Sequence, residues 1–351
     1  MKRTTNRLIA LLAAVPVFAG ASVMAGNPDR AGSAGATQLL INPWSRSAGM
    51  AMANSASLRG VEAMFGNVAG LSKVDKTELV FSNTQWLSGS GVTINSIGVG
   101  QKLGSSGVLG ISATTLGFGD IEVTTFDNPE GGRGTYRPAM SNIGISYAKA
   151  FSSSISGGFL LRVVSESISN VRASGVCFDA GIQYVTGEKE NLHFGIALKN
   201  VGPAMSYTGD GLSVQGILIQ GSDQLSLEQR SQGFEIPSLL NIGAAYDWHI
   251  NEMHRLTFAG TFISNSFTKD QGLVGIEYAF RKMVHLRGGY LYEDGITSDE
   301  ERTTVLTGPS AGISVDLPFG SEKKSAFAID YSYRSTNPFA GIHSIGVRVS
   351  L

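Results

Sequence analysis

Few residues of this chain have the types and spacing needed for catalysis. The segment 308–312 (GPSAG) matches G-x-S-x-G, a motif in which a strand–turn–helix elbow exposes a nucleophilic serine. Alternating apolar residues at Ile313, Val315 and Leu317 predict a strand directly after it, where the elbow needs a helix. We therefore expect no catalytic residues and a protein that is not an enzyme.

Candidate metal ligands are equally scattered. The five histidines form no H-E-x-x-H pair, and the acidic stretch 293–301 lacks the spacing of a calcium loop, so a solvated loop is expected there. Cys177 is the single cysteine, which excludes an internal disulfide and a multi-cysteine metal site. We expect no metal site and no cofactor.

The composition points to a weakly charged β protein. The 351 residues include 27 Lys+Arg and 28 Asp+Glu, a balance that argues against a nucleic-acid partner. Only 16% of residues are charged, against roughly 25% in ordinary soluble domains. Glycine is abundant, with 45 residues, yet no Gly-X-Y repeat is present.

The first 25 residues have the anatomy of a secretory signal peptide. Basic residues precede the apolar run 8–18, and small residues follow up to Ala25. The alternative is an uncleaved anchor, which Pro16 disfavours. No later apolar run approaches the ~18 residues of a transmembrane helix. An exported chain of this kind is periplasmic, secreted or an outer-membrane barrel.

Downstream of residue 76, apolar residues alternate with small or polar ones in segment after segment. A period of two predicts strands with one apolar face. Most segments run about 9–13 residues, close to the length of a tilted membrane-spanning strand. The expected strands, fourteen in all, are 77–86, 92–102, 107–117, 141–151, 154–169, 175–186, 191–199, 236–248, 254–264, 271–280, 283–293, 309–318, 324–334 and 342–351.

The expected connections alternate in length as they do in outer-membrane barrels. Long connections near 118–140, 200–235 and 294–308 fall on one side, and tight turns fall on the other. We therefore expect residues 77–351 to form an all-β, transmembrane antiparallel β-barrel of about 14 strands. It would lie in the cell outer membrane, in contact with lipid, with long loops extracellular and both termini periplasmic. The alternative is a soluble β protein that uses the same residues as core.

Residues 26–76 show no strand alternation and are rich in small residues and methionine. Because a barrel of this size leaves a lumen, we expect this segment to be a plug; the alternative is a disordered periplasmic linker. The segment resembles the PorV/PorQ family of FadL-like fourteen-stranded barrels, whose N-terminal pattern is an arginine, a small-Gly-Met step and an Asn-Pro-Ala-Gly-Leu box. The matching residues are Arg46, Gly49, Met50, Asn67, Ala69, Gly70 and Leu71, and Val68 stands where the family has proline.

Weaker matches in the same order continue through the strands, at 198–203, 235–243, 274–278, 286–290 and 329–334. The resemblance implies a role in the type IX secretion system. The partners would be a large translocon barrel protein and secreted cargo that carries a C-terminal signal domain. A FadL-like transporter of hydrophobic small molecules is the alternative, and a purely structural barrel is a third interpretation.

The loop 200–235 is the candidate docking surface, because it is long, weakly charged and rich in apolar residues. The alternative is that these residues fold back as a lid over the barrel mouth. The candidate partner-binding residues are Met205, Tyr207, Leu212, Ile217, Leu218 and Phe234.

Overall fold

The structure, a computed structural model, describes Gly26 and residues 30–217, 224–319 and 325–351. The expected signal peptide, 1–25, and Leu218 lie outside the described residues. Among the residues described, no helix is both long enough and apolar enough to cross a bilayer.

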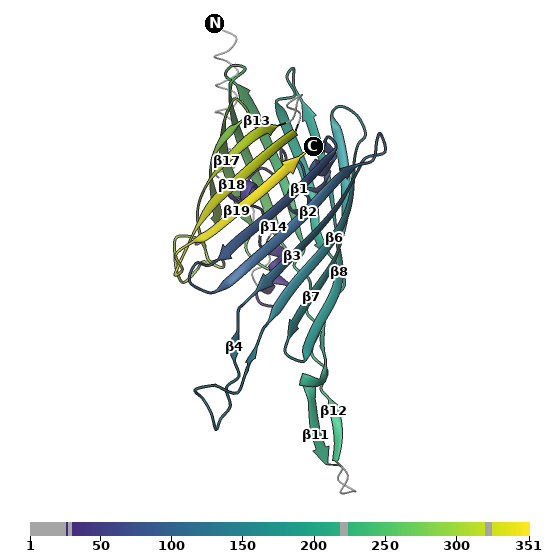
Figure 1. The fold of residues 1–351 in the computed structure, drawn as a ribbon, viewed down its shortest axis with the longest axis vertical. Coiled ribbons are helices and arrows are strands. Elements are labelled where there is room, and N and C mark those ends of the chain that lie inside the picture. The colour runs from purple at the N-terminus through teal and green to yellow at the C-terminus, as the bar shows by residue number, and fades with distance from the viewer. Residues whose placement is uncertain (1–25, 27–29, 218–223, 320–324) are drawn as a thin grey trace.

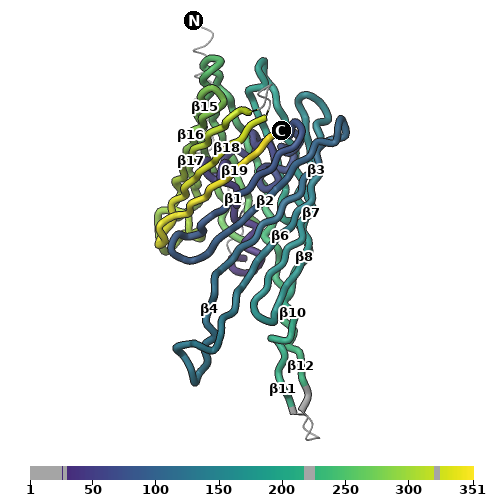
Figure 2. The backbone as a smooth tube through the Cα atoms, viewed as in Figure 1, coloured from purple at the N-terminus to yellow at the C-terminus, as the bar shows by residue number. Residues whose placement is uncertain are grey.

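Fourteen long strands close into an antiparallel barrel (Figure 1). Figure 2 shows the last strand lying beside the first, and their pairing from Glu78–Ser350 to Gln85–His343 closes the ring. The strands are β1 (Thr77–Trp86), β2 (Val92–Lys102), β3 (Val108–Gly117), β6 (Ala139–Ala150), β7 (Ile155–Ile168), β8 (Val171–Thr186), β9 (Leu192–Val201), β13 (Leu239–His249), β14 (His254–Asn265), β15 (Gln271–Phe280), β16 (Val284–Glu293), β17 (Leu306–Phe319), β18 (Ser325–Thr336) and β19 (Ile342–Ser350).

Each expected strand therefore corresponds to one barrel strand, and the expected barrel is confirmed. The sequence pattern does not predict the short strands inside the long connections, because they neither alternate between lipid and lumen nor reach spanning length. They are β4 (Ile121–Glu122), β5 (Thr135–Tyr136), β10 (Tyr207–Thr208), β11 (Ser213–Ile217) and β12 (Gln224–Glu228).

The alternation along each strand separates a lipid-facing surface from the lumen. In β1, Leu79 and Phe81 are exposed on the outer face, whereas Ser82 and Thr84 are buried inside. The outer face follows this pattern around the ring, with exposed Ile97, Ile111, Ile143, Ile145, Leu161, Ile182, Ile196, Ile276, Leu286 and Ile345. A belt of apolar side chains is stable only in contact with lipid, and this belt identifies the membrane-facing surface.

The two ends of the barrel differ. Tight turns, such as the one between β15 and β16, lie at what we call the short-turn end, together with the C-terminus (Figure 1). At the opposite, long-loop end, the β4–β5 hairpin and the β11–β12 hairpin project beyond the barrel (Figure 1). The helix η5 (Asp210–Leu212) leads into the second of these hairpins.

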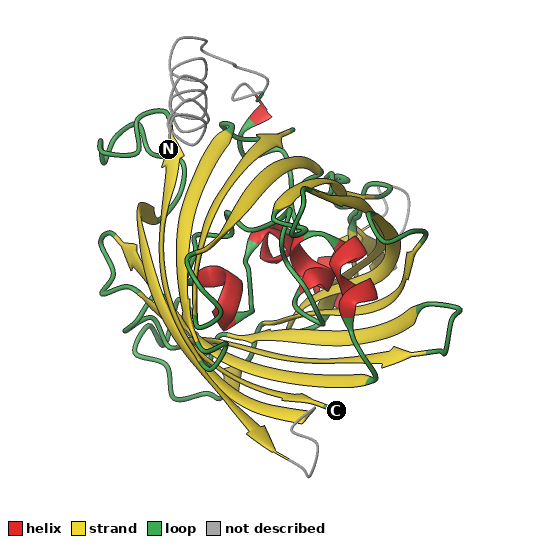
Figure 3. Cartoon of the chain, turned by 90° about the horizontal axis from the view of Figure 1, so that it is seen from above, coloured by secondary structure: helices red, strands yellow, loops and turns green. Residues whose placement is uncertain are grey.

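Residues of the N-terminal segment fill the lumen as the plug, here defined as 34–74. Seen along the barrel, its helices lie within the ring of strands (Figure 3). They are η3 (Thr37–Leu40), α2 (Ser45–Ala48), α3 (Ala63–Gly66) and η4 (Val68–Lys73). None exceeds six residues, so tertiary contacts with the barrel must supply most of their stability.

Three apolar clusters join the plug to the wall. In the first, Trp44, Phe65 and Leu71 pack against Val80 and Leu160. The second joins the plug to β13–β16, and the third joins it to β7, β8 and the start of the long loop. The second cluster includes Met50, Ala51, Ala53, Leu239, Ile263, Leu273 and Leu291, and the third consists of Ala36, Leu39, Val164, Ala173, Cys177, Met205 and Ile236.

The abundant glycine has a structural role at this interface. On several strands an inward-facing glycine lies where a side chain would collide with the plug. A Cβ on Gly289 would lie 2.3 Å from the carbonyl carbon of Met50, and one on Gly49 would lie 2.9 Å from the Cα of Gly312. The inward glycines against the plug include Gly98, Gly110, Gly158, Gly181, Gly195, Gly243, Gly275, Gly289 and Gly312.

Candidate functional site

The plug arginine of the family pattern is held by a buried carboxylate. Arg46 Nε lies 3.6 Å from Glu62 Oε2, and the Ser47 amide donates to the same oxygen at 3.2 Å. The Arg46 guanidinium also donates to the carbonyl of Arg59. Burial raises the pKa of the Glu62 carboxyl above its ordinary value, against the opposing effect of Arg46. These contacts tie α2 to the chain that leads into α3.

Asn67 connects the plug to the wall through one side chain. Its Nδ2 donates to the carbonyls of Ile182 on β8 and Ile196 on β9, at 3.1 and 3.4 Å. Its Oδ1 accepts from the Ala69 amide at 3.2 Å and so caps η4. This contact requires glycine at position 181 of the wall, because a Cβ on Gly181 would lie 2.1 Å from Asn67 Oδ1.

The other plug residues of the pattern also lie against the barrel or within the plug core. Gly49 meets Gly312 of β17, and Met50 is buried against the β13–β16 wall. Gly70 passes so close to Leu58 that a Cβ would lie 2.0 Å from its carbonyl oxygen. Leu71 is fully buried in the first cluster.

Inward-facing polar side chains of the barrel satisfy the irregular backbone of the plug. Gln183 Nε2 donates to the carbonyls of Ser55 and Leu58 at 3.2 and 3.0 Å. Thr261 Oγ1 donates to the carbonyl of Ala53 at 2.8 Å. Unpaired backbone groups inside a membrane protein are costly, so these bonds fix the path of the plug through the lumen.

Next to Asn67, the barrel wall carries glycine or alanine on both its inner and its outer face. Gly158 and Gly181 face inward there, and Gly157 and Ala180 face outward on the same two strands. On the lipid side the missing side chains leave an apolar hollow of about 460 Å³. Its further lining is Tyr147, Lys149, Phe151, Phe159, Ile182, Ile196 and Leu198.

A second cavity, with charged walls, lies inside the barrel near the short-turn end. It has a volume of about 140 Å³ and lies between the plug and the strands β13–β17 and β19. Among the inward-facing charged side chains, Glu277 lies 2.7 Å from Arg287, and Arg348 lies 4.0 Å from Asp330. Asp179 pairs with Arg162 at 3.1 Å. Arg281 lies outside the lumen, in the β15–β16 turn, with its guanidinium over the ring of Phe280.

Sequence reasoning did not single out several residues of this cavity. Arg255 and Asp316 lie on β14 and β17, and Arg59 lies in the plug. The alternating pattern of β14 and β17 does predict that Arg255 and Asp316 face the lumen, as Thr257 and Ser314 do. Their convergence depends on the pairing of four strands, which no local pattern encodes.

The candidate docking loop divides into two parts. Met205 is buried in the third cluster, and Tyr207 packs against Phe234 with tilted rings whose centroids lie 5.3 Å apart. The Tyr207 hydroxyl donates to Glu166 on β7, so these three residues lie against the barrel mouth. By contrast, Ile217 belongs to β11 of the projecting hairpin, and Leu212 belongs to η5, which leads into that hairpin.

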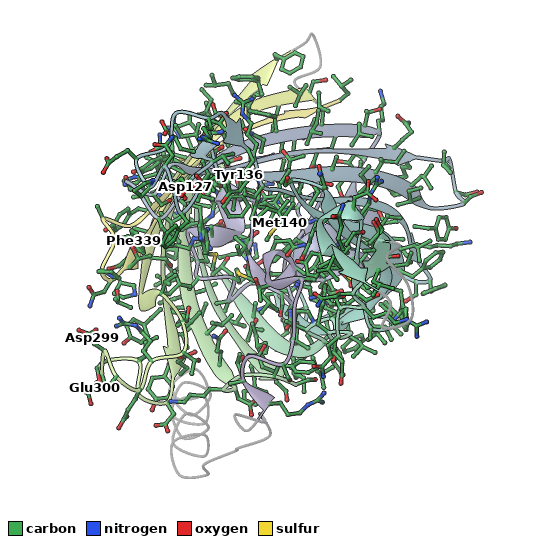
Figure 4. The ribbon with its side chains drawn as sticks, turned by 90° about the horizontal axis from the view of Figure 1, so that it is seen from below. Asp127, Tyr136, Met140, Asp299, Glu300 and Phe339 are labelled. Carbon is green, nitrogen blue, oxygen red and sulfur yellow. The ribbon has the colours of Figure 1, made fainter. Side chains whose placement is uncertain are left out.

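The residues considered for chemistry have structural partners. Ser310 lies within β17, with its hydroxyl 3.4 Å from the Gly49 carbonyl, and the strand continues past it to Phe319. Asp299 accepts from Arg302 and Asn337, and Figure 4 shows Asp299 and Glu300 at the outer edge of the long-loop end. Among the described residues no group of His, Cys, Asp and Glu could hold a metal ion.

No family model and no curated protein matches the chain. Solved structures do match. A CymD monoaromatic hydrocarbon channel aligns with a TM-score of 0.52 at 13% identity, over 88% of this chain and 97% of that chain. The Pseudomonas putida toluene transporter TodX aligns with a TM-score of 0.51 at 14% identity, over 84% and 94%.

A Pseudomonas aeruginosa FadL homologue aligns with a TM-score of 0.49 at 12% identity, over 87% of this chain and 96% of that chain. At such low identity a structural likeness shows a shared fold and does not transfer a substrate. The chain shares the barrel fold of the CymD channel and the TodX transporter.

Proposed function

We propose that this barrel takes up a hydrophobic small molecule at the apolar hollow formed by β7, β8 and β9. The observation that carries the proposal is the thin wall: glycine or alanine on both faces of β7 and β8, with Asn67 of the plug directly behind them. A molecule dissolved in the bilayer would reach this hollow without crossing water. The solved structures named as a hydrocarbon channel and a toluene transporter share the fold and support the class of ligand.

The test fills the hollow from the lipid side. Ala180 lines it, and Ala180→Leu adds volume there without touching the plug. Ala113→Leu on β3 is the matched control, because Ala113 also faces lipid, between Ile97 and Ile143. With the full chain reconstituted in liposomes, we expect Ala180→Leu to slow the initial uptake of radiolabelled toluene several-fold and Ala113→Leu to leave it unchanged. Equal rates in the three proteins would contradict the proposal.

The second candidate is a role in protein export, as the PorV/PorQ resemblance implies. The observation that favours it is the pair of hairpins beyond the barrel, which carry Phe126, Val214 and Leu227 exposed. Isolated two-stranded hairpins are marginally stable, and exposed apolar residues on them suit contact with another protein. A mild-detergent pull-down from native outer membranes tests it: a very large barrel and proteins sharing a C-terminal domain are expected to co-purify.

A further inference from the structure

The charged cavity at the short-turn end holds more cationic than anionic side chains. Two of its arginines come from the plug and three from the wall. The lining is completed by three carboxylates, one histidine and polar or apolar neighbours. The arginines are Arg46, Arg59, Arg255, Arg287 and Arg348, and the carboxylates are Asp247, Glu277 and Asp316.

The carboxylates Glu277 and Asp316 of the lining already form ion pairs with arginines of the cavity. Arg255 and Arg287 both approach Glu277, each at 2.7 Å, and His285 Nδ1 lies 3.5 Å from it, outside hydrogen-bond geometry. Asp316 accepts from the Arg348 guanidinium with both oxygens, at 3.1 Å each. Behind the lining, Glu62 and Asp330 stand 3.6 and 4.0 Å from Arg46 and Arg348, respectively.

Several nitrogen atoms in this cavity are buried and lack a hydrogen-bond partner. They are the Nε atoms of Arg255 and Arg348 and Nδ1 of His285. The Arg348 side chain is 91% buried, so solvent cannot easily satisfy it. A buried polar group left without a partner costs about 1–3 kcal/mol. Arg59 is exposed at the cavity, and its guanidinium forms no ion pair with any described residue.

We propose that this cavity binds a phosphate group. Guanidinium groups offer paired N–H donors that match phosphate oxygens, and several of them around one site favour a doubly charged anion. At about 140 Å³ the cavity resembles an engineered cavity of about 150 Å³ that holds benzene, so a phosphate fits and a long acyl chain does not. The group would enter from the short-turn end, as free phosphate or as part of a phospholipid headgroup.

Such a ligand would bridge the plug and the barrel. Arg59 and Arg46 approach it from the plug, whereas Arg255, Arg287 and Arg348 approach it from β14, β16 and β19. Because binding to the folded state stabilises that state, phosphate is expected to raise the thermal midpoint of the plugged barrel. This inference stands apart from hydrocarbon uptake, since the two sites use different strands.

The test uses the full chain purified in zwitterionic detergent, titrated calorimetrically with inorganic phosphate in low-salt buffer. Arg59→Gln removes a donor that has no ion-pair partner, and we expect it to weaken binding about tenfold or more, as for one charge-assisted hydrogen bond. Asp316→Asn removes a competing carboxylate and is expected to tighten binding. Arg133→Gln, in the β4–β5 connection at the other end, is the matched control and should bind like the parent.

The source of the phosphate is decided by a second arm. The protein is placed in nanodiscs of phosphatidylcholine that contain phosphatidic acid as about one lipid in ten, so that the bilayer carries anionic phosphate headgroups. Native mass spectrometry then shows which lipids stay bound. If inorganic phosphate does not bind but phosphatidic acid is retained by the parent and lost in Arg59→Gln, the group comes from a lipid. If neither probe binds, or if Arg59→Gln and Arg133→Gln behave alike, the cavity is a water-filled ion-pair network and the proposal is overturned.

Discussion

Asn67 illustrates how much of this fold depends on single side chains. Its amide reaches two strands of the wall while its carbonyl oxygen caps a helix of the plug. We expect Asn67→Ala to lower the free energy of unfolding by about 1–3 kcal/mol, because buried hydrogen-bonding groups lose their partner. Urea unfolding of the purified barrel measures this change.

Trp44 can report where the loss occurs, because it is buried in the plug. In a background with Trp86→Phe and Trp248→Phe, its emission should shift to the red at lower urea in Asn67→Ala. The control is Asn83→Ala, which removes an exposed side-chain pair with Asn95 and should leave the midpoint unchanged. If the Trp44 emission shifts at the same urea concentration in Asn67→Ala as in the parent, the apolar clusters alone hold the plug.

At the scale of the element, the strands could be predicted from sequence and their contacts with the plug could not. Alternation along β9 or β13 places apolar residues in lipid and small or polar residues in the lumen, and that pattern is local. The function of the small residues is not local. Gly288 and Gly289 look equivalent in sequence, yet only Gly289 faces the plug, where it touches Met50.

This difference gives a prediction with a built-in control. Gly289→Ala would place its Cβ against the Met50 backbone, so the plug or β16 must shift, and we expect a loss of about 1–3 kcal/mol from overpacking. Gly288→Ala faces lipid and meets its nearest atom at 3.8 Å, which is ordinary contact. Urea unfolding of the two variants in the same detergent makes the comparison, and equal midpoints would refute the assigned role of Gly289.

At the scale of the molecule, the sequence predicts the barrel and its unequal loops, but not which loop segments leave the barrel. Met205, Tyr207 and Phe234 resemble surface candidates in sequence, and the structure folds them onto β7, β8 and the plug. The β11–β12 hairpin instead projects past the mouth (Figure 1), where Val214 and Leu227 are exposed. Long-range packing at the mouth decides between these outcomes, so composition cannot separate them.

The hairpin therefore offers the deletion that separates the two functional candidates. Replacing 213–228 with a short Gly-Ser link removes β11 and β12 and spares Met205, Tyr207 and Phe234, so the barrel should keep its heat-modifiable migration in gels and its uptake of toluene. If the protein serves export, the same deletion should abolish capture of the large barrel and cargo. Deleting the 123–134 connection of the β4–β5 hairpin tests the other projecting hairpin, which exposes Phe126. If both deletion variants still capture the large barrel and cargo, the partner surface lies elsewhere. If the 213–228 deletion abolishes toluene uptake while the barrel still folds, the hairpin takes part in transport.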